Sequence, residues 1–137
     1  MNNSEENIYA RDKAIRYIGI SKKTEYEVRK KLKGLKVTSS VIDEEIEYLK
    51  ELGFLDDKDY VKSFVRQSEK MQNYSIYEIT NKLLQKGIKA SIIDEEIELL
   101  KETDYEQKVV DRLVSGKLKD YDELKQKQYL YRRGFKI

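Results

Sequence analysis

Ser40-Val-Ile-Asp-Glu-Glu-Ile-Glu-Tyr-Leu-Lys-Glu51 occurs twice in this sequence. The second copy, Ser91-Ile-Ile-Asp-Glu-Glu-Ile-Glu-Leu-Leu-Lys-Glu102, is identical at ten of twelve positions and lies 51 residues further on. The same offset carries Tyr26-Glu27-Val28 onto Tyr77-Glu78-Ile79 without a gap. Self-similarity at a fixed period of this size is typical of helical repeat arrays. The duplication therefore predicts tandem copies of one helical unit.

The composition also favours an all-α protein. Of the 137 residues, 39% are charged, proline is absent, and apolar residues recur at helical spacing. This pattern is typical of amphipathic helices rather than strands. No apolar run approaches the roughly 20 residues that span a bilayer, and no signal peptide is evident. The lack of cysteine excludes disulfides and suits a reducing compartment. We expect a cytoplasmic monomer with no membrane contact.

Eight helices are expected along the chain, in three units. A polar lead occupies 1–8, three-helix repeat 1 occupies 9–55, and three-helix repeat 2 occupies 56–103. Partial repeat 3, with two helices, occupies 104–137. Stacked three-helix units of this kind predict a curved, elongated array.

Capping residues and glycines give the expected helix ends. The first helix is expected at Tyr9–Ile18, and Asp56 or Asp57 is expected to cap the fourth. Three pairs have capping-box spacing: Thr24 with Glu27, Ser75 with Glu78, and Asp120 with Glu123. Four glycines are expected to end helices: Gly19, Gly53, Gly87 and Gly134.

The apolar positions of the duplicated helix predict its buried face. The expected inward residues are Ile42, Ile46 and Leu49 in the first copy, and Ile93, Ile97 and Leu100 in the second. Three tyrosines fall on core stripes, where packing is the simplest role: Tyr17, Tyr48 and Tyr60. Tyr129 and Tyr131 lie among basic residues, which suits helix packing, base stacking or a protein interface.

Charge is sorted by helix, although the net charge is only +2. Residues 22–36 include seven basic and two acidic side chains, whereas 40–51 and 91–102 each include five acidic and one basic. Residues 117–137 include seven basic and three acidic. The basic segments are candidates for phosphate or acidic protein surfaces. The competing interpretation is that neighbouring helices of opposite charge pair with each other.

The sequence offers no catalytic site. It contains no histidine and no cysteine, which removes most nucleophile–base pairs and most zinc sites. The segment 56–59 holds three aspartates but lacks the glycine turn of a calcium loop, so helix capping explains it better. Asp43, Glu44 and Glu47 are expected on an outer helix face, where solvation or ion pairing is the simpler role. We expect no enzyme, no metal site and no cofactor.

Several motifs occur in an order and spacing that resemble the RecX regulatory proteins. They are Ala14-x2-Tyr17-Ile18, Gly53-Phe-Leu-Asp-Asp57 followed by Tyr60-Val61, Lys86-Gly87-Ile88, and the closing Arg133-Gly134-Phe135. The similarity runs from about Ala10 to Phe135. The family pattern continues with another helix, which this sequence lacks, so the third repeat is expected to be incomplete.

The resemblance implies a modulator of the RecA recombinase, acting in DNA repair, recombination and the SOS response. Such a protein lies in the groove of the RecA–DNA filament and inhibits ATP turnover and strand exchange. The partners implied are the RecA filament and the single- or double-stranded DNA backbone. The candidate contact residues are Arg29, Lys30, Lys33, Lys82, Lys86, Lys125, Arg132 and Arg133.

Two other functions remain open from the sequence. Short three-helix units resemble helix-turn-helix modules, which would make the chain a stand-alone nucleic-acid-binding protein. The near-neutral net charge and the lack of an obvious recognition helix count against this as the main role. A helical-repeat adaptor for some other protein is equally compatible with the periodicity.

Overall fold

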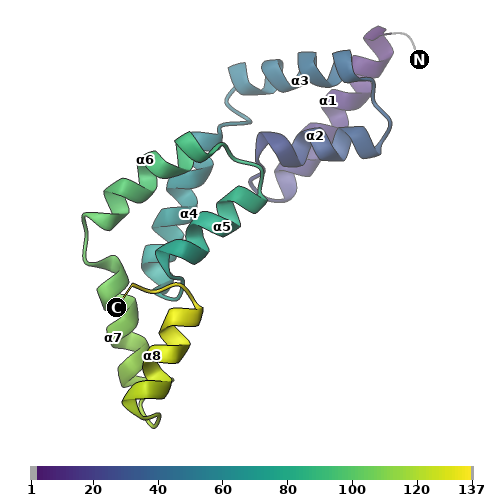
Figure 1. Cartoon of the computed structure of the whole chain (residues 1–137). Helices are drawn as coiled ribbons and strands as arrows, with labels where there is room; N and C mark the ends of the chain where they lie inside the picture. The colour runs from purple at the N-terminus through teal and green to yellow at the C-terminus, as the bar shows by residue number, and fades with distance from the viewer. Residues whose placement is uncertain (1–2, 137) are drawn as a thin grey trace. The chain divides into compact units, whose positions relative to one another are not determined.

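A computed structural model describes residues 3–136. In this range the chain forms eight helices and no strand, in agreement with the expected all-α class (Figure 1): α1 (Asn3–Ile20), α2 (Glu25–Gly34), α3 (Ser39–Glu51), α4 (Asp57–Met71), α5 (Ile76–Gln85), α6 (Ala90–Lys101), α7 (Tyr105–Ser115) and α8 (Glu123–Arg132). The chain divides into two compact units. The first runs to Tyr60 and includes Lys86–Ile88; the second contains Val61–Gln85 and continues from Lys89.

In the first unit, α1, α2 and α3 pack against one another in a triangle. Two alanines of α1, Ala10 and Ala14, are fully buried and allow the other two helices to approach closely. The remaining core side chains are large and aliphatic: Val28, Leu32, Val41, Ile42, Ile46, Leu49 and Leu55. The expected inward face of α3 is therefore confirmed.

Helix α1 begins at Asn3, six residues before the expected Tyr9. Its first turn is held by Glu6, whose carboxylate accepts hydrogen bonds from the Thr38 backbone N–H at 2.9 Å and hydroxyl at 2.8 Å. These two bonds lower the pKa of Glu6. The helix also continues through Gly19 to Ile20, so the expected stop at Gly19 was wrong.

Glu45 on α3 is a buried carboxylate, with only 1% of its surface exposed. Arg11 of α1 donates to both of its oxygens, at 2.8 and 3.1 Å, and Asn7 donates to one at 2.9 Å. A buried charge needs this kind of pairing to avoid a large desolvation penalty. The guanidinium of Arg11 also lies 3.8 Å from the centre of the Tyr48 ring. Tyr48 is 36% exposed, so it packs on the ion pair while part of its side chain remains in solvent.

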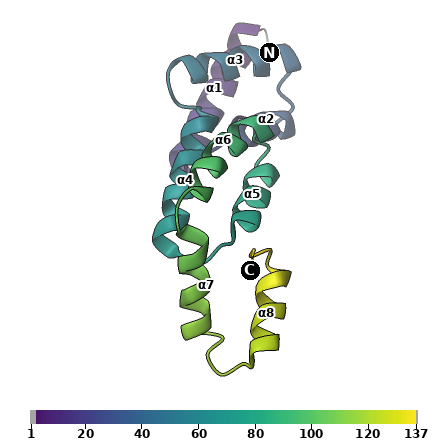
Figure 2. The ribbon, with the colours of Figure 1, turned by 60° about the vertical axis from the view of Figure 1, so that its left-hand side comes forward.

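The second unit repeats the arrangement of helices with α5 and α6 packed together and α7 following α6. α7 and α8 are joined by a turn and lie alongside each other (Figure 2). The core again consists of aliphatic and aromatic side chains: Ile79, Leu83, Ile93, Ile97, Leu100, Tyr105, Val109, Leu113, Leu118, Leu130 and Phe135.

The helix caps agree with the sequence at most positions. Thr24 with Glu27 forms the expected capping box, and the Ser75 hydroxyl and Glu78 carboxylate accept each other's backbone N–H at 3.0 and 2.9 Å. The Asp56 carboxylate accepts the Asp59 N–H, so Asp56 caps α4. For α8 the expectation was wrong: the cap is Asp122, which accepts the Lys125 N–H at 2.8 Å, because Asp120 lies in the preceding turn.

Candidate partner-binding surfaces

Five of the eight candidate residues are exposed, and four of these five contact neither a carboxylate nor an aromatic ring: Lys30, Lys33, Lys125 and Arg132. None of these side chains has a hydrogen-bond or ion-pair partner within residues 3–136. Lys30 and Lys33 are one helical turn apart on α2, so they project in similar directions. These four residues have no structural role that would occupy their charge, which leaves them available to an external anion.

Arg29 on α2 differs from its neighbours because it is half-buried and doubly paired. Its guanidinium contacts Asp43 of α3 at 2.7 Å and Glu25 of its own helix at 3.2 Å. Lys50 of α3 also contacts Glu25, at 3.2 Å. Despite partial burial, the hydrogen bonds from Lys50 and Arg29 lower the pKa of Glu25. In this unit the basic second helix and the acidic third helix therefore pair with each other, as the competing interpretation anticipated.

Lys86 belongs to a contact that we name capping joint 1, formed by Thr24, Tyr26, Glu27, Lys86 and Gly87. The Thr24 hydroxyl, which caps α2, also donates to the Lys86 carbonyl at 2.7 Å. The Lys86 ammonium reaches Glu27 at 3.3 Å, and this contact raises the pKa of Lys86. Gly87 has a φ of +78°, and a Cβ atom there would lie 2.2 Å from Cγ of Tyr26. Only glycine fits this close approach.

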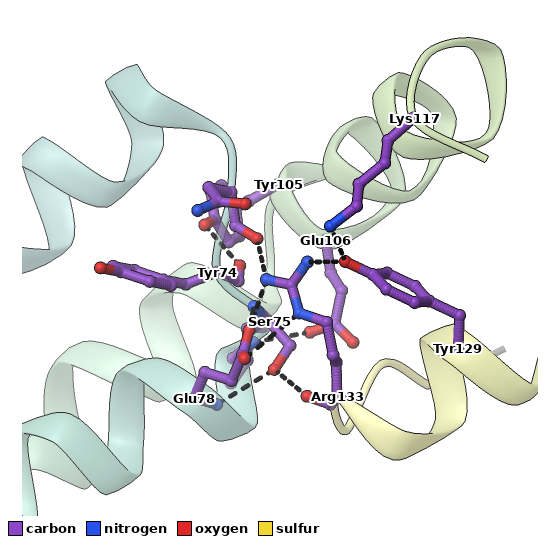
Figure 3. A network of polar contacts seen from close by, with 10 residues as sticks. Tyr74, Ser75, Glu78, Tyr105, Glu106, Lys117, Tyr129 and Arg133 are labelled. Carbon is purple, nitrogen blue, oxygen red and sulfur yellow. Dashed lines mark hydrogen bonds and ion pairs between the residues drawn. The ribbon is translucent and has the colours of Figure 1, made fainter. Parts of the chain in front are cut away.

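Arg133 has the equivalent role in capping joint 2, formed by Ser75, Tyr77, Glu78, Arg133 and Gly134. Figure 3 shows Ser75, Glu78 and Arg133 of this joint. The Ser75 hydroxyl donates to the Arg133 carbonyl at 2.6 Å. The Arg133 guanidinium contacts Glu78 at 2.8 Å, and Gly134 has a φ of +85° with Tyr77 packed against it. The capping boxes are visible in the sequence, but the carbonyl and cation that complete each joint lie 55 to 62 residues away along the chain.

The Arg133 guanidinium has further partners in the second unit. It donates to the Asn73 carbonyl at 2.5 Å and to the Tyr129 hydroxyl at 3.2 Å, and the latter also accepts from Lys117 at 3.1 Å (Figure 3). Although partial burial opposes it, these two cations lower the pKa of Tyr129. Tyr129 therefore packs within the unit, whereas Tyr131 is 78% exposed.

Lys82 is exposed and its ammonium lies 4.8 Å from the centre of the Tyr74 ring, a cation–π contact. Tyr131 lies on α8 with Leu124, which is 66% exposed, and with the free cations Lys125 and Arg132. The α8 surface thus presents an aromatic ring, an aliphatic side chain and two positive charges together.

Across residues 3–136 no group of three or more acidic side chains is arranged to hold a metal ion. The same part of the chain contains no helix long and apolar enough to cross a membrane. Of the exposed acidic residues of α3, Asp43 and Glu47 form ion pairs with Arg29 and Lys50, and Glu44 accepts a hydrogen bond from the Asn7 amide.

Two family models match consecutive parts of this chain. RecX, first three-helix domain, matches residues 10–49, and RecX, second three-helix domain, matches residues 56–96. The chain belongs to the RecX family. The match to a family of regulatory proteins agrees with the expectation that this chain is not an enzyme.

The chain is also similar in sequence to regulatory proteins RecX from several bacteria. The Regulatory protein RecX of Streptococcus agalactiae serotype III (strain NEM316) is 35% identical over 105 residues, which cover 77% of this chain and 41% of that protein. The Regulatory protein RecX of Caldanaerobacter subterraneus subsp. tengcongensis is 33% identical over 130 residues, which cover 93% of this chain and 65% of that protein. This RecX chain therefore matches less than two thirds of the length of these relatives.

Solved structures agree with the fold. The crystal structure of RecX from Lactobacillus salivarius has a TM-score of 0.81 at 26% identity, covering 97% of this chain and 90% of that one. A second crystal structure of a regulatory protein RecX has a TM-score of 0.82 at 22% identity and covers 98% of this chain and 69% of that one. The tandem three-helix domains of RecX are thus the fold of this chain.

Proposed function

We propose that this RecX chain binds in the groove of the RecA–DNA filament in the cytoplasm, as a monomer, and inhibits ATP hydrolysis and strand exchange. Membership in a family of regulatory proteins supports a regulatory role. The observation that carries the binding surface is the set of exposed cations without internal partners: Lys30, Lys33, Lys125 and Arg132.

The four other basic candidates support this surface indirectly. Arg29, Lys86 and Arg133 are held by carboxylates, and Lys82 by an aromatic ring. The carboxylates partly neutralise the charges of Arg29, Lys86 and Arg133, so an external anion gains less from these three residues than from a free lysine. In this proposal the four residues stabilise the positions of the helices that carry the free cations.

The proposed mechanism needs only binding. In this proposal, inhibition results from restricting the movement of recombinase subunits relative to each other. A helical array that contacts two subunits, or a subunit and the DNA backbone, opposes this movement by binding one arrangement more tightly than the other. No catalytic group is needed for such inhibition.

The test is a titration of RecA ATPase activity on single-stranded DNA with sub-stoichiometric amounts of this protein, together with co-sedimentation with the filaments. We expect turnover to fall at less than one molecule per RecA subunit, and the protein to sediment with filaments but not with free DNA at the same salt concentration. Unchanged turnover combined with no co-sedimentation would refute the proposal.

Direct binding to nucleic acid is the second candidate function, favoured by the α8 surface of Tyr131, Leu124, Lys125 and Arg132. Aromatic rings stack on unpaired bases while cations contact phosphates. Gel-shift measurements without RecA, on single- and double-stranded DNA at two salt concentrations, separate the two functions. Binding as tight as that to filaments would favour the second one.

A further inference from the structure

The second unit contains an open cavity of about 500 Å³, lined by residues of α5 and α6 and by Thr103, Glu106, Gly134 and Lys136. Its apolar lining comes from Ile76, Tyr77 and Ile97, and its polar lining from Thr80, Asp94, Glu98, Lys101, Thr103, Glu106 and Lys136. This volume lies within the range of small-ligand pockets in proteins. None of the functions discussed above uses it.

The 51-residue offset identifies what occupies the equivalent positions in the first unit. Thr80 corresponds to Arg29, Asp94 to Asp43, and Ile76 to Glu25. In the first unit the Arg29 guanidinium spans from α2 to α3 and is held by the Asp43 carboxylate at 2.7 Å. In the second unit Thr80 is too short to span this distance, and the Asp94 carboxylate has no partner among the described residues.

The other charged groups of the cavity are already engaged, with one exception. Glu98 pairs with Lys101 at 3.1 Å, and the two carboxylate oxygens of Glu106 accept the backbone N–H groups of Ile76 at 3.2 Å and Lys136 at 2.8 Å. The Lys136 ammonium is exposed. Three carboxylates against two ammonium groups give the lining a net negative charge.

We propose that this cavity binds an arginine side chain presented by a partner protein, which takes the place that Arg29 has in the first unit. The guanidinium donates to Asp94, as Arg29 donates to Asp43. The exposed Tyr77 ring, 61% accessible, offers a face for stacking, and the arginine stem lies along Ile76 and Ile97. The first unit needs no such partner because its own arginine makes the contact.

The probe is N-acetylarginine methylamide, titrated into the protein and followed by amide chemical shifts of residues around Asp94 and Tyr77. Neither RecA nor DNA is present, so the outcome is independent of the proposed filament binding. We expect saturable shifts confined to the cavity, and no saturation with N-acetylcitrulline methylamide, which has the same shape without the charge. Equal binding of the citrulline derivative, or tighter binding of N-acetylglutamate methylamide, overturns the proposal.

Exchange of residues between the two units gives the sharpest controls. Asp94→Asn, an exposed substitution, should weaken binding of the arginine probe about tenfold, since it removes a charge-assisted contact. Ile76→Glu with Thr80→Arg should abolish binding by supplying an internal arginine. The reverse pair, Glu25→Ile with Arg29→Thr, should create a second site near Asp43. Glu123→Gln, on the exposed face of α8, should leave binding unchanged; unaltered binding in Asp94→Asn contradicts the proposal.

Discussion

The Ser75 hydroxyl donates to the Arg133 carbonyl at 2.6 Å while its oxygen accepts the Glu78 N–H that begins α5. A single buried hydroxyl thus satisfies a helix start and a helix end that are 58 residues apart. The Thr24 hydroxyl makes the same pair of bonds to Lys86 and Glu27. In each capping joint, one hydroxyl therefore bonds both to the start of one helix and to a carbonyl that follows another helix.

Ser75→Ala should lower the free energy of unfolding by about 1–3 kcal/mol, because it removes a helix cap and leaves the Arg133 carbonyl without its donor. Urea denaturation followed by circular dichroism measures this change. Ser115→Ala is the matched control: its hydroxyl is exposed and donates only to carbonyls of its own helix, those of Asp111 and Arg112, so the expected change is within about 0.5 kcal/mol. Equal effects of the two substitutions would contradict the role of the joint.

Gly134→Ala should destabilise the protein more than Gly53→Ala. Both glycines have positive φ, +85° and +80°, so both alanines cost about 1–2 kcal/mol in backbone strain. A Cβ at position 134 would in addition lie 2.6 Å from Cδ1 of Tyr77, whereas position 53 has nothing within 4 Å. The difference between the two midpoints of thermal unfolding isolates the packing contact.

That difference should shrink when Tyr77→Ala is introduced into both variants, since the smaller side chain leaves room for the new methyl group. A difference that persists unchanged in the Tyr77→Ala background would mean that the aromatic ring is not what excludes a side chain at position 134.

Ile46→Ala and Ile97→Ala should each lower the free energy of unfolding by about 2–5 kcal/mol, as expected for a buried large-to-small change. Ile46 is fully buried and Ile97 is 4% exposed. Leu99→Ala, at a 56% exposed position of α6, is the control and should change stability little. Denaturant titrations of the three variants provide the comparison.

Replacing Lys30 and Lys33 with glutamate should weaken RecA inhibition while thermal stability stays within a few degrees of the original. If these lysines contact DNA phosphates, the slope of log affinity against log salt should also fall by about 0.7–0.9 for each contact removed. The control, Arg66→Glu with Lys70→Glu, makes the same change in net charge at two exposed positions of α4. Equal loss of inhibition in both variants would indicate a general charge effect instead of a contact.

The stability of capping joint 2 should depend on pH through Glu78. Although burial opposes it, hydrogen bonds from Arg133 and the Ser75 backbone lower the pKa of Glu78 in the folded protein. Its contribution is therefore present above the ordinary glutamate value of about 4.3 and is lost as the pH falls through the lower folded value. Glu78→Gln should reduce the loss of stability on acidification, measured as the thermal midpoint between pH 6 and pH 3. Glu123→Gln, on an exposed ion pair, should not.

The sequence predicts the local features of this fold, because they depend on residues that are only a few positions apart. The capping boxes at Thr24 and Ser75, the inward stripe of Ile42, Ile46 and Leu49, and the left-handed stop at Gly53 are all of this kind. The spacing alone determines such contacts, and the 51-residue offset transfers them from one unit to the next.

The sequence does not predict the contacts between residues that are far apart along the chain. The guanidinium of Arg133 contacts Glu78, 55 residues earlier, and no local pattern indicates this pairing. Glu45 is a buried carboxylate because Arg11, 34 residues earlier, lies over it. Periodicity gives the face on which a side chain lies, but packing decides whether that face meets solvent or another helix.

The direction of protein synthesis sets the order in which the two capping joints can form. The first three helices are complete at Glu51, but Thr24 and Glu27 acquire their last partner only when Lys86 has emerged from the ribosome. Until then the carbonyl acceptor and the ammonium that complete the start of α2 are missing. The first unit therefore lacks these two contacts while α4 and α5 are translated, and it gains them only with the residues that follow α5.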